Sequence, residues 1–312
     1  MKIRMFWMAW VLSSVMMAGC GGGDNSSNGG SGGGGAGGSE GGTTAMGGSC
    51  PEQASGTAAN HIVITVSWPD SLGLAAGEGE MHVWTKADLT FNGNEVTGTV
   101  KPCGSMIPAL TKSDLAGGGM VQTVIPDEVW EAASMPVFDV KGTISGFDVG
   151  ATVGMDPVAS VVGATLPDPA NDAWPASADQ LTTVDADGDG QPGIKAVPRT
   201  DDPFQAPPLD LNGALDPNGD RADELYLASR TMVKLAGTRD SCTSAKGTAD
   251  VTHVDSHVVG CHVKGKDYCT PTQSKFVDDN QPKFKIKSAT YEMVQVPADA
   301  TCADVRAALP AK

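Results

Sequence analysis

Residues Glu80–Lys101 read EMHVWTKADLTFNGNEVTGTVK, and this stretch decides the fold class. From Glu80 to Phe91 apolar and polar residues alternate, which is the period-two pattern of a strand with one buried face. Asn92-Gly93-Asn94 then supplies a tight turn, and the alternation resumes at Glu95. A polar Asn-Gly turn between two alternating runs predicts an antiparallel β-hairpin.

Similar alternation recurs on both sides of this hairpin. Further strands are predicted at His61–Trp68, Met120–Ile125, Val137–Val149, Ala159–Ala164, Glu224–Leu235, Gly247–Val254, His257–Val263 and Lys283–Val296. A short helix is expected after Thr301, because Thr301 and Asp304 have the spacing of a capping box. We therefore expect an all-β domain. Alternation alone does not separate a barrel from a sandwich, but long strands joined by hairpin-like turns favour an antiparallel barrel.

Residues 165–224 interrupt the strand pattern. Ten of the 20 prolines lie between Pro157 and Pro217. Because proline cannot donate a hydrogen bond to a sheet, this segment is predicted to be a long loop rich in proline and aspartate. A loop of this length is usually functional or disordered.

The loop contains a motif with metal-binding chemistry, Asp185-Ala186-Asp187-Gly188-Asp189-Gly190-Gln191. Carboxylates at alternate positions converge as the chain curls, Gly190 permits the turn, and the carbonyl of Gln191 adds an oxygen. The motif resembles EF-hand, dockerin and thrombospondin type 3 loops, and this resemblance implies a structural Ca²⁺. The twelfth EF-hand position is Ala196 instead of an acid, so a closing carboxylate has to come from elsewhere, for example Asp201 or Asp202. The alternative is a solvated acidic turn.

A second acidic run also places oxygen side chains at alternate positions. Its candidate ligands are Asp216, Asn218, Asp220 and Asp223. It resembles a thrombospondin type 3 unit, which implies a second calcium site. Arg221 lies inside the run and argues against a cation there. The alternative is a turn formed by Asn218-Gly219 for backbone reasons.

The first 49 residues are predicted to target and tether the protein. Residues 1–19 begin with Lys2 and Arg4, and an apolar run too short for an ordinary membrane span follows. Met17-Ala18-Gly19-Cys20 resembles a bacterial lipobox, which implies lipidation of Cys20. Gly21 follows where an Asp would imply retention in the inner membrane, so the resemblance implies the outer membrane. Residues 21–49 are rich in Gly and Ser and are expected to be a flexible linker.

Six cysteines remain in the β-domain at 50–312. An even number in an exported domain predicts three disulfides among Cys50, Cys103, Cys242, Cys261, Cys269 and Cys302. A hairpin turn at Asp255-Ser256 would place Cys242 opposite Cys269. We therefore predict Cys242–Cys269, with Cys261–Cys302 and Cys50–Cys103 as the other bonds, out of fifteen possible pairings.

The charge balance excludes one class of partner. The formal net charge is −16. Loss of the signal segment with Lys2 and Arg4 makes the net charge about −18, and so strongly acidic a chain is not expected to bind nucleic acid phosphates. Acidic character fits calcium binding and an exported domain.

The motifs for catalysis are weak. His253, His257 and Cys261 share one strand parity and could form a zinc site, but an exported cysteine among six is better assigned to a disulfide. Outside the glycine-rich linker there is no Gly-x-Ser-x-Gly elbow, and the chain has no phosphate-binding Gly-x-x-x-x-Gly-Lys-Ser/Thr loop and no His-Glu-x-x-His motif. The sequence leaves open the alternative that the protein is a hydrolase whose active site is assembled from residues scattered along the chain.

Taken together, the lipobox, the glycine-rich linker and the Asp-rich loop ending in Pro192-Gly193 resemble the uncharacterised acidic surface lipoproteins common in myxobacteria. This resemblance implies localisation and calcium, not an activity. The favoured hypothesis is a non-catalytic surface or periplasm-facing lipoprotein, whose calcium-stabilised β-domain binds a small molecule, a glycan or a protein partner. The alternatives are an exported hydrolase with its active site under residues 165–224, or a structural envelope component. An apolar cavity inside a closed barrel would favour small-ligand binding.

Overall fold

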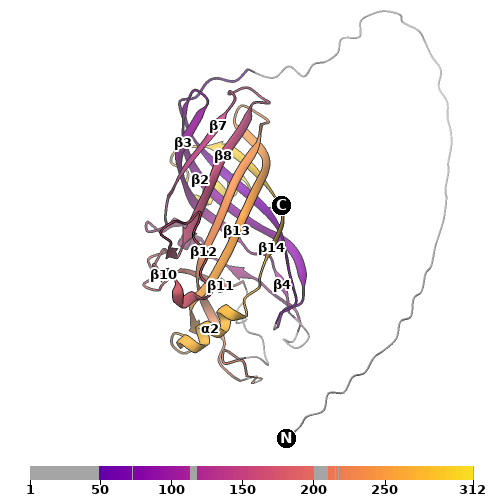
Figure 1. Cartoon of the computed structure of the whole chain (residues 1–312), viewed down its shortest axis with the longest axis vertical. Helices are drawn as coiled ribbons and strands as arrows, with labels where there is room; N and C mark the ends of the chain where they lie inside the picture. Colours follow the sequence, from indigo (N-terminus) through magenta and orange to yellow (C-terminus); the bar gives the residue numbers. More distant parts are fainter. Residues whose placement is uncertain are drawn as a thin grey trace, which may run out of the picture. The chain divides into compact units, whose positions relative to one another are not determined.

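Eight long strands form a closed antiparallel sheet in the computed structural model, which describes residues 49–71, 73–112, 118–199, 210–214, 216 and 218–311. These strands are β1 (Ser55–Trp68), β2 (Gly77–Asn92), β3 (Glu95–Met106), β7 (Phe138–Ile144), β8 (Thr152–Val162), β12 (Ala222–Arg239), β13 (Ser244–Val263) and β14 (Lys285–Val296). Their order is β3-β2-β1-β14-β13-β12-β8-β7, and pairing of β7 with β3 closes the circle. The fold is therefore a β-barrel with tilted strands (Figure 1).

Two short strands complete the wall where β7 and β8 do not reach. β6 (Thr123–Val124) pairs with the end of β3 at Met106, and β11 (Ile194–Pro198) pairs with both β6 and β12. β11 comes from the segment predicted as an irregular loop. The remaining strands form two small sheets, β4 (Leu110–Thr111) with β5 (Met120–Val121), and β9 (Ala164–Thr165) with β10 (Thr182–Thr183).

In the part of the chain that the structure describes, three α-helices and one 3-10 turn lie around the barrel. They are α1 (Asp127–Glu131), η2 (Ala178–Gln180), α2 (Pro271–Asp279) and α3 (Cys302–Ala308). Capping boxes begin α2 at Thr270 and α3 at Thr301, so the predicted terminal helix and its cap are confirmed. None of the helices in the described ranges has the length and hydrophobicity that a membrane span needs.

Strand alternation divides the wall into two faces. On β1, Ile62, Ile64 and Val66 are at most 4% exposed and belong to the apolar cluster of the barrel interior. The opposite face of β1, β2 and β3 is covered by α3. There, the indole Nε1 of Trp84 donates to the carbonyl of Leu309 (2.7 Å). The predicted hairpin of β2 and β3 is present, with Asn92 paired to Glu95 across the turn.

The predicted turn at Asp255-Ser256 is wrong. β13 runs without a break from Ser244 to Val263. Asp255 lies opposite Arg230 of β12, and the two side chains form an ion pair (2.7 Å), so this polar dipeptide belongs to the ladder.

Three disulfides staple the barrel, as predicted, but the predicted pairing is wrong. The bonds are Cys50–Cys242, Cys103–Cys302 and Cys261–Cys269. The error follows from the missing turn. Cys242 precedes β13 and Cys269 follows it, so the 20-residue strand separates them by roughly 60 Å. The signal segment 1–19, the lipidation candidate Cys20 and nearly all of the linker lie outside the described residues.

Candidate functional site

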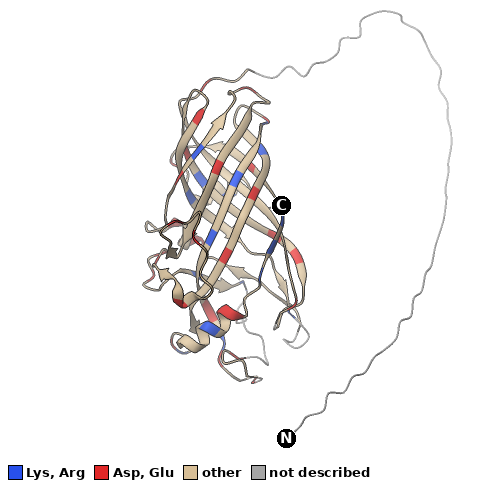
Figure 2. Ribbon diagram, viewed as in Figure 1, with Lys and Arg blue, Asp and Glu red and all other residues tan. Residues whose placement is uncertain are grey.

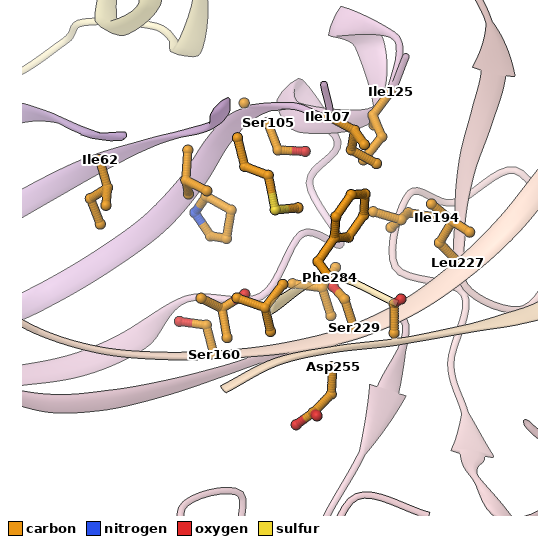
Figure 3. A pocket seen from close by; sticks show the side chains of 18 of the residues that line it. Ile62, Ser105, Ile107, Ile125, Ser160, Ile194, Leu227, Ser229, Asp255 and Phe284 are labelled. Atoms are coloured by element: carbon orange, nitrogen blue, oxygen red, sulfur yellow. The ribbon is translucent and has the colours of Figure 1, made fainter. Parts of the chain in front are cut away.

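The barrel contains an apolar cavity of about 380 Å³. Side chains from the interior face of several strands line it, together with residues of α2 and of the segment before β14. The aliphatic and aromatic members include Ile62, Val83, Leu89, Ile107, Ile125, Val158, Ile194, Leu225, Leu227, Val233, Val258, Phe276, Phe284 and Met293. Figure 3 shows Ile62, Ile107, Ile125, Leu227 and Phe284 pointing into the pocket from different elements. The volume falls within the range of about 300–1,000 Å³ that is typical of small-molecule sites.

The polar groups of the cavity are few and mostly uncharged. Hydroxyls of Ser105, Ser160, Ser229 and Thr231 belong to the lining. Asp255 lies in the wall, but its carboxylate points away from the pocket (Figure 3) and pairs with Arg230 at 2.7 Å. The centre of the pocket therefore offers an apolar surface with scattered hydrogen-bonding groups.

One carboxamide in this wall is not satisfied. Asn60 of β1 is 4% exposed and lines the cavity. Its Nδ2 donates to Thr85 Oγ1 on β2 (3.3 Å), while its Oδ1 is buried without a hydrogen-bond partner. The period-two pattern could have identified this residue, because Asn60 has the same parity as Ile62 and Ile64 and so places a polar group on the buried face.

The outer wall around Arg230 fixes the segment that follows β9. Arg230 is 2% exposed, and its Nη1 donates to the carbonyls of Asp172 (2.6 Å) and Pro169 (3.2 Å). Its guanidinium also lies 5.6 Å from the ring centroid of Trp174, a cation–π contact. These contacts hold residues 169–174 against the barrel.

His257 makes structural hydrogen bonds and does not form the zinc site considered from the sequence. Its Nδ1 lies 2.9 Å from Asp278 Oδ2 on α2, and its Nε2 lies 3.0 Å from the carbonyl of Pro175. Both neighbours are hydrogen-bond acceptors, so both ring nitrogens are engaged and neither is left to bind a metal. Cys261 is bonded to Cys269 and offers no thiolate. His257 thus connects β13, α2 and the loop.

The Asp185–Gln191 loop gathers its carboxylates as predicted. One ligand oxygen from each of Asp185, Asp187 and Asp189 lies within 4.8 Å of the other two. Asp185 accepts the N–H groups of Gly188 (2.7 Å) and Gly190 (2.9 Å), and Asp189 accepts that of Gln191 (2.8 Å). Both glycines have positive φ angles, 78° and 87°, which curl the chain around the carboxylates.

Asp187 is the most buried of the three acids. Its Oδ2 accepts the N–H of Lys195 at the start of β11 (2.8 Å), whereas its Oδ1 is buried without a partner. Burial raises the pKa of Asp187, the N–H of Lys195 opposes this, and the charge of Asp189 adds to it. An acceptor with no donor, next to two further carboxylates, fits a hard cation.

The twelfth position of the loop is unsuited to a ligand. Ala196 is fully buried within β11, so no side chain closes the cation sphere from there. Asp201 and Asp202 lie outside the described residues. The candidate cation ligands that the structure brings together are therefore the carboxylates of Asp185, Asp187 and Asp189.

The second acidic run is not gathered around one point. Asp220 pairs with Lys266 (2.5 Å), and Asp223 pairs with His262 (2.7 Å). Asp216 Oδ1 accepts the backbone N–H of Asn218, which is the predicted alternative of a turn. Within the described ranges, the only group of three acids, histidines or cysteines arranged for a metal is Asp185, Asp187 and Asp189.

α2 was not predicted, although it contributes Phe276 and Val277 to the cavity. Its sequence signal was the capping box formed by Thr270 and Gln273 with Pro271 at the first helical position.

Comparisons with known proteins returned no family model, no curated protein and no solved structure that matches this chain.

Proposed function

We propose that this protein binds an apolar small molecule inside its β-barrel. The observation that carries the proposal is the cavity of about 380 Å³ lined by aliphatic side chains. Transfer of an apolar ligand from water into such a site is favoured by about 25 cal/mol per Å² of surface that it buries. A glycan, which needs many hydrogen-bonding partners, fits this lining poorly.

The proposal includes an exported, lipid-anchored location. Its support is the lipobox-like sequence ending in Cys20 and the 29 residues of linker that follow it. A linker of that composition has a root-mean-square length of roughly 30 Å, which holds the barrel clear of the lipid headgroups. Lys and Arg are interspersed with Asp and Glu along the barrel and α2 in the view of Figure 2, which supports a ligand other than nucleic acid.

We also propose that Ca²⁺ binds Asp185, Asp187 and Asp189 in a structural role. The support is the unpartnered Oδ1 of Asp187 and the convergence of the three carboxylates. The loop leads directly into β11, whose Ile194 lines the cavity. A cation there would fix one section of the cavity wall.

The cavity hypothesis is tested by titrating the protein with an uncharged environment-sensitive dye, 6-propionyl-2-dimethylaminonaphthalene. The protein is the full chain with Cys20→Ser, folded in an oxidising compartment and purified without detergent. We expect saturable binding with a blue-shifted emission. Ser229→Phe should reduce dye affinity by about tenfold or more, because the added ring occupies the apolar volume that the dye needs.

A matched control keeps the added ring but moves it outside. Thr290 is exposed on β14, beside the buried Ala289 and Tyr291, so Thr290→Phe should bind the dye as the parent does. Dye binding that is equally strong in all three proteins would mean that the dye binds the surface, and the cavity hypothesis would be wrong. Circular dichroism checks that both variants keep the strand content.

A further inference from the structure

We propose that the ligand of the barrel carries a hydroxyl group, and that Asn60 of β1 and Thr85 of β2 recognise it. This inference rests on the proposed cavity function and specifies the class of ligand, an apolar body with an alcohol that is held midway along the wall. It is based on one buried carboxamide whose hydrogen-bonding capacity is incomplete.

The burial of Asn60 makes its free oxygen significant. The residue is 4% exposed, and its Oδ1 has neither solvent contact nor a hydrogen-bond partner. Buried polar groups in folded proteins are paired in the great majority of cases. Backbone N–H groups of β14 and β2 are committed to the ladders that flank Asn60, where it pairs with Met293 and Thr85. A molecule inside the barrel can supply the missing donor.

Thr85 provides the complementary half of the site. Its Oγ1 accepts from Asn60 Nδ2 (3.3 Å), and the hydroxyl can donate its own proton at the same time. A ligand hydroxyl placed between the two residues donates to Asn60 Oδ1 and accepts from Thr85. An ether oxygen has no proton and satisfies only the Thr85 side.

The hydroxyl groups of the lining do not need a hydrogen-bond donor from a ligand in the same way. A serine or threonine hydroxyl rotates and can bond to a nearby backbone carbonyl, whereas a carboxamide oxygen is only an acceptor and needs an incoming donor. Access to Oδ1 requires a small movement of neighbouring side chains. Met293 is opposite Asn60 on β14 and also lines the cavity, and its unbranched side chain adapts readily to such a change.

The test compares decan-1-ol with 1-methoxydecane as competitors for the dye described above. Both have the same ten-carbon chain, and only the alcohol donates a hydrogen bond. In the parent protein we expect the alcohol to bind about tenfold more tightly than the ether, since leaving a buried acceptor unpaired costs that order of affinity. In Asn60→Leu, a substitution of nearly equal size, the two competitors should bind equally.

The control variant is Thr231→Val, which removes a different hydroxyl of the lining on β12. It should retain the preference for the alcohol. Equal affinities of alcohol and ether in the parent protein would overturn hydroxyl recognition while leaving the cavity function intact. If neither competitor displaces the dye, the proposed function itself fails. The comparison in the parent protein does not depend on whether Asn60→Leu folds.

Discussion

At the scale of single residues, Asp187 decides whether the acidic loop is a cation site. Its buried Oδ1 has no partner, and a bound Ca²⁺ would supply one. At a calcium concentration 100 times the dissociation constant, linkage stabilises the folded state by about 2.7 kcal/mol. Calcium should therefore raise the melting temperature of the parent protein. We expect Asp187→Asn to abolish this rise, and the exposed control Asp139→Asn to retain it. Melting curves of the three proteins with calcium and with chelator provide the measurement, and a melting temperature of the parent that does not change with calcium would contradict the site.

His82 makes stability depend on pH. Its ring lies against His61, with 3.0 Å between Nε2 of His61 and Nδ1 of His82, and Glu80 is 3.9 Å away. Burial lowers the pKa of His82 below 6.5, and the charge of Glu80 only partly offsets this. The unfolded chain therefore binds the proton first as the pH falls through 6.5, so His82 reduces the free energy of unfolding at acid pH.

We expect His82→Gln to flatten the decline of stability between about pH 7 and pH 5. His262 has the opposite sign, because its hydrogen bond to Asp223 raises its pKa and adds stability that is lost as the pH rises. His262→Gln should consequently make the decline at acid pH steeper. Urea unfolding at several pH values measures both slopes, and identical slopes in the parent and His82→Gln would disprove the assignment.

The residue scale also shows what the sequence can predict of a site. Asp185, Asp187 and Asp189 are neighbours in sequence, so alternation alone brought them together correctly. In the second run, Asp220 pairs with Lys266 and Asp223 pairs with His262. These partners are distant in sequence, so the run itself could not reveal them. The role of Asn60 depends on Thr85 across a strand pair and could not be assigned before the register was known.

At the scale of elements, alternation identified most long strands, but it divided β13 into two and placed other strand ends wrongly, for example the start of β8 at Ala159 instead of Thr152. Asp255-Ser256 has the composition of a turn, yet β13 continues because Arg230 of β12 satisfies Asp255. That cross-strand partner is not visible in the local pattern. The same error caused the wrong disulfide pairing. A hairpin would place Cys242 opposite Cys269, whereas the continuous strand β13 separates them by its whole length.

The disulfides stabilise their elements unequally. Cys103–Cys302 ties α3 to β3 across 199 residues, whereas Cys261–Cys269 spans only 8. Loop-closure entropy predicts that the first contributes roughly 5 kcal/mol and the second roughly 2.5 kcal/mol. We expect the double variant Cys103→Ala/Cys302→Ala to lose about twice as much stability as Cys261→Ala/Cys269→Ala in urea unfolding. A larger loss for the short loop would show that strain or packing, not chain entropy, sets these contributions.

At the scale of the whole molecule, the proposed anchor can be separated from the barrel. We expect the parent protein in the outer-membrane fraction and the Cys20→Ser variant in the soluble fraction, because under the proposed lipidation the acyl chains on Cys20 would provide the membrane affinity. Both proteins should bind the dye equally. Membrane association that survives Cys20→Ser would contradict the lipid anchor and point to a contact made by another part of the chain.

The long strands and hairpin-like turns favoured a barrel, but the pairing of β7 with β3 that closes it could not be predicted, because it joins strands that no local pattern connects. The closed wall determines how a ligand in the cavity would stabilise the fold. The cavity is lined by strands from all around the sheet and by α2, so a ligand touches parts of the chain that are far apart in sequence and should stabilise them as one unit.

Decan-1-ol at 100 times its dissociation constant should add about 2.7 kcal/mol to the free energy of unfolding, which corresponds to a rise of roughly 5–10 °C in melting temperature for a domain of this size. We expect a single transition that moves as a whole, a similar shift in Thr290→Phe, and a much smaller one in Ser229→Phe. A transition that splits on adding the alcohol would show instead that the ligand stabilises only one side of the barrel.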